Sequence, residues 1–212
     1  MSKLHAALEF FEEAKAYSTI SALQDEVEWQ RSRDWHAFCE ADLLREGAWV
    51  ILCTGFRETI VRKSFGYISL AFCDWESAAS IVAAASLCRA TALAAINNER
   101  KIDAIIALAD QVNTLGFCDL KYRIIDDPVR ELQKLPYIGP ITAMHLAKNL
   151  GFNCAKQDRH LARLSAALGY TDATELCAAI AFANGEKLSV VDLILWRYIA
   201  DNVPDFPYSP CR

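Results

Sequence analysis

The sequence predicts an all-α protein. Apolar residues recur along almost the whole chain at the three- and four-residue spacing of a helix face, and no stretch alternates strictly enough for a β-strand. The 212 residues include only eight glycines and six prolines, most of them where one helical segment gives way to the next. We therefore expect helices joined by short turns, with no low-complexity linker and no internal repeat.

Helix start and stop signals delimit the expected elements. Asp34 and Asp74 each precede an apolar-periodic segment and are predicted N-caps. Pro128 suits the first turn of a helix, Gly151 suits a helix end, and the prolines from residue 204 onward end the last helix. With ends defined to about two to four residues, the expected helices span 3–16, 20–31, 34–44, 46–70, 74–84, 87–95, 98–115, 127–134, 138–150, 159–168, 172–184 and 188–202.

Composition favours a soluble, folded protein. A hydrophobic fraction of 53% is ample for a core, and the length suits one globular body or two small lobes. No apolar stretch reaches the ~20 residues of a membrane span, and acidic residues near the N-terminus exclude a signal peptide. The eight cysteines lack metal-ligand spacing, which favours reduced, buried thiols. We expect a cytoplasmic monomer, nucleoid-associated if prokaryotic, with no metal, cofactor or membrane partner.

The segment from residue 135 to 163 carries the most functional information. Its first part, Leu-Pro-Tyr-Ile-Gly-Pro-Ile-Thr-Ala, places a Gly-Pro turn between two helical segments. A tight turn of this kind directs unpaired N–H groups toward one point, where a phosphate can bind. Gly139 can adopt a positive φ, and Pro140 suits the first turn of the second helix. Taken alone, the pattern also fits an ordinary pair of antiparallel helices.

A single carboxylate follows this turn. Asp158 precedes Arg-His-Leu-Ala-Arg and is an expected N-cap, where the helix stabilises its charged form. A charged carboxylate can stabilise an oxocarbenium-like transition state at C1′ of a deoxyribose or activate a water molecule. Between Lys134 and Arg163, five basic residues and one acid give a local charge of +4 in a chain of net charge −5. Such concentration of positive charge is typical of a nucleic-acid contact.

Together these residues resemble the helix–hairpin–helix and Gly/Pro-loop-Asp superfamily of DNA glycosylases, which includes endonuclease III and the adenine, 8-oxoguanine and 3-methyladenine glycosylases. The family's Val-Asp-x-His segment is matched by residues 157–160, and weaker similarity covers 97–101 and 49–63. The resemblance implies a two-lobed helical fold. One lobe, 46–150, would include the hairpin motif at about 131–150, and the other, 1–45 with 151–212, would carry Asp158. The family hairpin is matched at Leu135, Pro136, Ile138, Gly139, Thr142 and Ala143.

The chain departs from the family pattern in ways that bear on chemistry. Tyr137 replaces the first glycine of the hairpin, so the turn should differ slightly. Ile141 stands where bifunctional members carry the Schiff-base lysine, so the expected nucleophile is water. Lys156 is a candidate substitute amine, although a phosphate contact is the commoner role of a loop lysine. Only two cysteines follow Asp158, which excludes the family's four-cysteine iron–sulfur cluster.

The resemblance also implies the remaining site residues. Asp158 would be catalytic, with phosphate held by the hairpin and by the loop before Asp158. The predicted DNA-binding residues are Tyr137, Ile138, Gly139, Ile141, Thr142, Lys156, Arg159 and His160. A glycosylase must also flip out its target base and fill the gap that the base leaves. Candidates for this pocket or wedge are Trp49, Phe56, Arg57, Glu58 and Trp196, each aromatic having a place in the core as its alternative.

These observations predict a monofunctional DNA glycosylase that acts in base-excision repair on double-stranded DNA containing a damaged or modified base. Three alternatives stay open. A non-catalytic DNA-binding module would keep the Gly turn without needing an acid. A bifunctional glycosylase and AP lyase would use Lys156 as its amine. An unrelated helical protein would carry the hairpin by chance.

Overall fold

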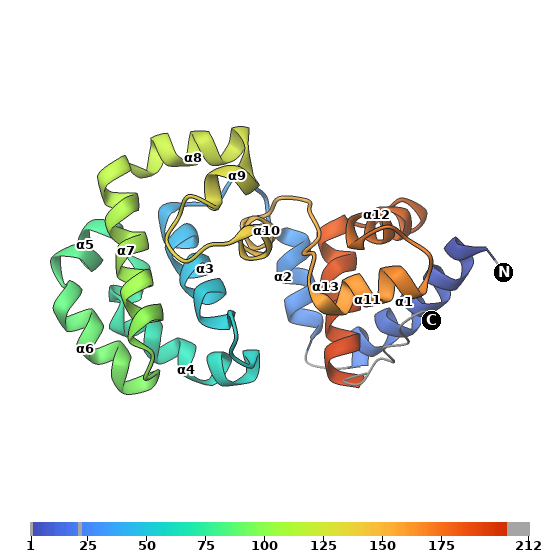
Figure 1. The fold of residues 1–212 in the computed structure, drawn as a ribbon, viewed down its shortest axis with the longest axis horizontal. Helices are drawn as coiled ribbons and strands as arrows, with labels where there is room; N and C mark the ends of the chain where they lie inside the picture. The colour runs from blue at the N-terminus through green and yellow to red at the C-terminus, as the bar shows by residue number, and fades with distance from the viewer. Residues whose placement is uncertain (1, 21–22, 203–212) are drawn as a thin grey trace, which may run out of the picture. The chain divides into compact units, whose positions relative to one another are not determined.

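The computed structural model describes residues 2–20 and 23–202, and all regular secondary structure in these ranges is helical (Figure 1). The described chain contains thirteen α-helices and one short 3-10 helix, and it contains no β-strand. The prediction of an all-α protein is therefore confirmed. No helix in these ranges is both long and apolar enough to cross a membrane.

The chain divides into two compact units. Unit 1 combines Met1–Arg33 with Gly151–Arg212, and unit 2 is Asp34–Leu150. The sequence placed the first boundary at 45/46, which lies inside helix α3 (Glu40–Cys53). Because α3 is one continuous helix, the division falls before it, and residues 34–45 belong to unit 2.

Unit 2 is built around helix α7 (Glu99–Leu115), which packs against α3 and three further helices (Figure 1). The buried face of α7 includes Ile102, Ile105 and Leu108, at the spacing of one helix face. A Cβ on Gly47 of α3 would lie 2.5 Å from Leu108 Cδ2, so glycine permits the close approach of the two helices. The other helices of the unit are α4 (Glu58–Ala71), η1 (Cys73–Trp75), α5 (Ala78–Ala83), α6 (Ala85–Ala95), α8 (Phe117–Asp126), α9 (Pro128–Leu132) and α10 (Pro140–Asn149).

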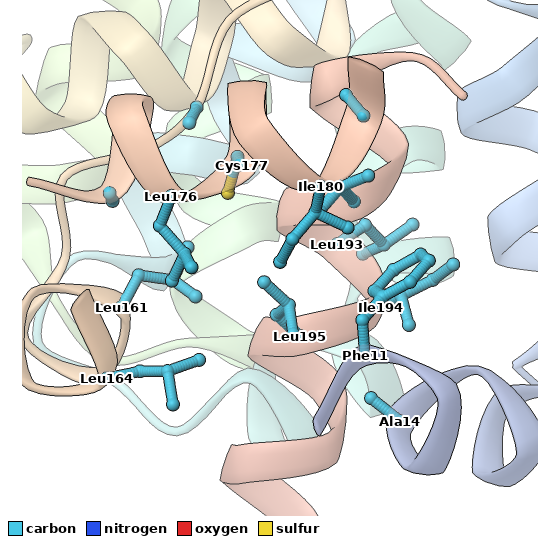
Figure 2. Packing of buried hydrophobic residues seen from close by; sticks show 14 of the residues in the cluster. Phe11, Ala14, Leu161, Leu164, Leu176, Cys177, Ile180, Leu193, Ile194 and Leu195 are labelled. Carbon is cyan, nitrogen blue, oxygen red and sulfur yellow. The ribbon is translucent and has the colours of Figure 1, made fainter. Parts of the chain in front are cut away.

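Unit 1 is organised by helix α13 (Leu188–Asn202), which packs against every other helix of the unit. Those helices are α1 (Lys3–Ile20), α2 (Gln24–Ser32), α11 (Arg159–Ala167) and α12 (Ala173–Asn184). Figure 2 shows Leu161 and Leu164 of α11 directed into the same core as Leu195 of α13. Each such buried leucine contributes about 1.5–3 kcal/mol. This packing fixes α11, and with it the position of Asp158 at its N-terminus.

Several expectations for unit 2 differ from the structure. The separate helix expected over 34–44 is absent, because residues 40–44 are the start of α3. The single helix expected over 46–70 is two helices, α3 and α4, separated by residues 54–57. Gly55 in this loop has φ +78°, which ends the helical path, and no periodicity argument detects such a break. Helix α8 was not expected, because it is only ten residues long and just two of those residues, Leu120 and Ile124, are buried.

Two predicted N-caps are wrong. Asp34 accepts a hydrogen bond from the N–H of His36 in a turn, and α3 begins only at Glu40. Asp74 lies inside η1 with φ +50°, and Ser77 caps the following helix instead. For Asp34, the short polar side chain therefore stabilises a turn rather than a helix start.

Other predicted helix signals are confirmed. Pro128 is the first residue of α9, and the side chain of Asp127 accepts a hydrogen bond from the N–H of Arg130. Gly151 has φ +101° directly after α10, as a helix stop requires. The prolines from residue 204 onward lie outside the described residues.

Candidate nucleic-acid interface and catalytic carboxylate

The hairpin of unit 2 exposes the start of helix α10. Gly139 is the N-cap of α10, and α9 packs against α10 on the other side of the turn. Among the described residues, no atom accepts a hydrogen bond from the N–H groups of Gly139, Ile141 or Thr142. A buried hydrogen bond from Asn149 Nδ2 to Glu46 Oε2 (2.9 Å) ties α10 to α3. The helix is therefore held firmly while its first N–H groups are open to an anion.

Ile138 has a structural role instead of the expected backbone contact with phosphate. Its N–H donates to the carbonyl oxygen of Leu135 at 3.2 Å, and its side chain is buried. The N–H is thus already used, so the prediction that it binds phosphate is wrong. The buried side chain instead anchors the turn in the core of unit 2.

Tyr137 and Gly139 have exchanged the backbone roles that the sequence suggested. Tyr137 has φ +65°, so it adopts the left-handed conformation at a cost of about 1–2 kcal/mol. Gly139 has φ −89° and ψ −179°, an extended conformation open to any residue, so a positive φ there is wrong. A Cβ on Gly139 would meet nothing within 4 Å. Neither backbone strain nor packing requires this glycine, which leaves the backbone open to close approach by a ligand.

The predicted wedge and pocket residues of the early segment fall into two groups. Phe56 and Arg57 lie in the loop between α3 and α4, where Phe56 is half-buried and Arg57 is exposed. Trp49 packs edge-on against Phe65 at 5.0 Å, and Glu58 forms an ion pair with Arg62. Trp49 and Glu58 therefore have structural contacts within unit 2, whereas Phe56 and Arg57 lie between its helices α3 and α4.

In unit 1, the two carboxylate oxygens of Asp158 have different partners. Oδ1 accepts hydrogen bonds from the N–H groups of His160 (2.9 Å) and Leu161 (3.1 Å), so the predicted N-cap is confirmed. Oδ2 lies 3.8 Å from Lys156 Nζ. The side chain of Asp158 is 12% exposed. Its capping oxygen is therefore fixed, and the second oxygen faces the loop lysine.

A fully buried acid that the sequence reasoning missed holds the loop before Asp158. Asp192 of α13 is 1% exposed, and its Oδ1 accepts the N–H of Lys156 at 2.7 Å. Gln157 is tied to the start of α12, because its Oε1 accepts the N–H of Ala173 (3.2 Å). A lone acid in an apolar helix is the signal that could have found Asp192, because a buried carboxylate needs donors.

Several predicted residues gather around Asp158. The pKa of His160 is lowered by burial and by the cations Arg159, Arg163 and Lys156, while Asp158 opposes that shift. Its Nε2 lies 3.4 Å from Arg159 Nε, whose N–H donates to it. Arg159 is exposed. The histidine is therefore a neutral hydrogen-bonding group at pH 7.

Trp196 of α13 belongs to the same neighbourhood. Lys156 Nζ lies 5.9 Å from the centre of its ring, and the Arg197 guanidinium lies 4.8 Å from it. Arg197 is itself paired with Glu26. Unit 1 thus brings Lys156, Asp158 and Trp196 together, whereas the other predicted pocket residues belong to unit 2.

The basic charge is less concentrated than the sequence suggested. Lys148 is buried in unit 2, and Lys134 forms an ion pair with Glu131 that lowers the pKa of that acid. These two lysines are therefore not free phosphate contacts. The basic residues near Asp158 in unit 1 are Lys156, Arg159 and Arg163.

Two hollows, one in each unit, lie away from these residues. One in unit 1, of about 170 Å³, is lined by Lys15, Glu28, Arg31 and Glu186 among others, and does not include Asp158. Its arginine donates to both glutamates, so its charge is already balanced. Within the described part of the chain, no group of three or more His, Cys, Asp or Glu side chains is arranged to hold a metal ion.

Comparison with known proteins adds no relative. No protein-family model, no curated protein and no solved structure matched this chain.

Proposed function

We propose that this chain is a monofunctional DNA glycosylase that hydrolyses the N-glycosidic bond of a damaged or modified base in duplex DNA. The observation that carries the proposal is the carboxylate of Asp158. One oxygen is committed to capping α11, and the other lies beside Lys156 in a loop pinned by Asp192. Such a preorganised, partly buried charge suits a reaction in which positive charge develops on a sugar.

In this mechanism Asp158 acts at C1′ of the target nucleotide. As the bond to the base breaks, the sugar becomes an oxocarbenium-like cation, and the carboxylate stabilises it. The same carboxylate orients or deprotonates the water that attacks C1′, and the base leaves with the bonding electrons. Lys156 and Arg159 carry positive charge beside this acid and are assigned to the neighbouring phosphates.

The hairpin of unit 2 is assigned to the DNA backbone. Its support is the set of open N–H groups at Gly139, Ile141 and Thr142, together with a glycine that the fold itself does not require. These groups bind phosphate without reading sequence, as a lesion-searching enzyme needs. Tyr137 and Ile141, both exposed, flank this position.

A base-release screen tests the proposal. Duplex oligonucleotides, each carrying one alkylated, oxidised, mismatched or modified base, are incubated with the wild type and with Asp158→Asn. Hot alkali then converts abasic sites into strand breaks, and lanes without alkali report lyase cleavage. Asp158-dependent abasic sites on any duplex support the enzyme. Salt-sensitive binding without base release on any duplex favours a non-catalytic binding module.

One observation favours a second candidate, a bifunctional glycosylase and AP lyase. Lys156 Nζ lies 3.8 Å from the Asp158 carboxylate, so a small side-chain movement or one bridging water would let that acid accept the ammonium proton. The neutral amine would attack C1′ and displace the base, and the resulting imine would permit β-elimination of the 3′ phosphate. Borohydride would trap this imine on the wild type but not on Lys156→Met. Absence of a trapped product, with base release intact, would leave water as the nucleophile.

A further inference from the structure

A buried lysine, Lys101, lies where the loop of Phe56 meets the hairpin of unit 2. Its side chain is only 3% exposed. Nζ donates hydrogen bonds to the carbonyl oxygens of Leu52 (2.8 Å), Ile51 and Thr54 at the end of α3. The last carbonyls of a helix lack partners within the helix and carry partial negative charge, so a cation there is favourable.

The same ammonium group contacts two aromatic rings from distant parts of the sequence. It lies 4.7 Å from the ring centre of Phe56 and 5.7 Å from that of Tyr137. Burial lowers the pKa of Lys101 to about 8, while the nearby Cys53 opposes this shift. The three carbonyl acceptors favour the charged form. At neutral pH the group is therefore a cation held between a helix end and two aromatic faces.

The contact with Lys101 explains why a strained residue stands in the hairpin. Tyr137 adopts a left-handed conformation that glycine would adopt without cost. A cation–π interaction between an aromatic ring and a desolvated cation contributes about 2 kcal/mol, which offsets that strain. Tyr137 is also 40% exposed, so one part of its ring covers Lys101 and another faces solvent. Phe56 is likewise half-buried.

We propose that Lys101 is a positioning residue that holds Phe56 and Tyr137 as one aromatic pair, which stacks against DNA bases while the hairpin binds phosphate. This inference rests on the proposed function and deepens it, because the pair would fill the space that a flipped base leaves. Stacking on an aromatic side chain contributes about 1–3 kcal/mol per base, against a few kcal/mol for unstacking a step. Because Tyr137 belongs to the hairpin, one binding event would provide both base stacking and phosphate binding.

Unit 2 provides a matched control for Lys101. Lys121 Nζ donates to the carbonyl oxygens of His36 (2.8 Å) and Phe38 (2.7 Å). It also lies 4.8 Å from the ring centre of Phe38 and 6.0 Å from that of Phe117. Lys121 therefore makes the same kinds of contact as Lys101, but to neither Phe56 nor Tyr137. Lys121→Met therefore reports how far the loss of a lysine that bonds backbone carbonyls beside aromatic rings weakens DNA binding through the fold alone.

The experiment uses the full chain and a duplex with a tetrahydrofuran abasic analogue opposite 2-aminopurine. The fluorescence of 2-aminopurine changes when an aromatic side chain alters base stacking at the abasic position. We expect Lys101→Met to lose this change and to bind the duplex roughly five- to thirty-fold more weakly. Lys101→Arg should retain part of the signal, and Lys121→Met should retain all of it. Equal behaviour of Lys101→Met and Lys121→Met would overturn the proposal.

A double-mutant cycle decides the question even if Lys101→Met does not fold. Phe56→Ala and Tyr137→Ala should be non-additive in duplex affinity, since each removes part of one aromatic pair. Additive effects would contradict the shared role. Neither readout requires catalysis, so non-additive affinities without base release would count against the proposed function and not against the stacking of this pair on DNA. Conversely, Asp158-dependent base release with additive effects would overturn this inference alone.

Discussion

At the residue scale, Asp158 has an observed role in folding, and the proposed function adds a chemical role. Its Oδ1 satisfies two N–H groups at the start of α11, and its Oδ2 is left beside Lys156. The sequence indicated both roles, because an acid before an apolar-periodic segment is a typical N-cap. It did not indicate Asp192, since the pairing of α13 with the loop depends on tertiary packing.

The capping role predicts a difference between two substitutions of Asp158. Asparagine is nearly as good an N-cap as aspartate, so Asp158→Asn should leave the free energy of unfolding almost unchanged. Asp158→Ala removes the acceptor and should lower it by about 1 kcal/mol. Urea denaturation of the three proteins checks this, and equal stability of the alanine and asparagine variants would contradict the observed cap.

His160 predicts a pH dependence of stability. Burial lowers the pKa of the folded His160 below its ordinary value of 6.5, so below that pH the unfolded chain binds the proton more readily. Stability from this group is therefore present above pH 6.5 and is lost as the pH falls from that value through the lower pKa of the folded state. The difference in unfolding free energy between wild type and His160→Gln should show this slope. A flat difference between pH 5 and 8 would contradict it.

At the element scale, the hairpin was predictable but its backbone geometry was not. A Gly-Pro turn between two helical segments indicated the motif, and α9 and α10 confirm the two helices. The sequence placed the flexible backbone at Gly139, whereas the structure places the left-handed residue at Tyr137. The ring of Tyr137 lies 5.7 Å from the ammonium of Lys101, which belongs to a helix that precedes the hairpin in the chain. Local preferences cannot reveal such a contact.

The strain at Tyr137 can be measured by comparing two truncations. Tyr137→Ala removes the ring and keeps the left-handed strain, whereas Tyr137→Gly removes both. The glycine variant should therefore be more stable than the alanine variant by about 1 kcal/mol, as measured by urea unfolding. An alanine variant as stable as the glycine variant would show that residue 137 does not hold a left-handed conformation.

Gly139 tests whether the hairpin backbone meets a ligand. Because a Cβ there meets nothing and the backbone is extended, Gly139→Ala should leave unfolding unchanged. Its affinity for duplex DNA should fall on the order of ten-fold, about 1.4 kcal/mol, if phosphate approaches the backbone there. Gly66→Ala in α4, which is equally unobstructed, is the control and should bind as the wild type does. Equal affinity of both variants would remove the hairpin from the interface.

At the scale of the whole molecule, the sequence predicted the all-α class and most helices, because helical periodicity is a local signal. It missed the break between α3 and α4 and the amphipathic α8, which depend on Gly55 and on neighbouring helices. The division into two units also begins earlier than expected, before α3. The proposal assigns phosphate binding to unit 2 and the reacting carboxylate to unit 1. It therefore predicts that binding and chemistry can be impaired separately.

The role of Asp158 in base release can be measured by single-turnover kinetics on a duplex that the base-release screen identifies. The rate of base release and the affinity for the same duplex are measured for wild type and Asp158→Asn. We expect base release by Asp158→Asn to be about 100- to 10,000-fold slower than by the wild type, with unchanged affinity for the duplex, because asparagine keeps the cap but not the charge. A variant that releases the base at the wild-type rate would contradict the assignment of Asp158 and with it the proposed mechanism.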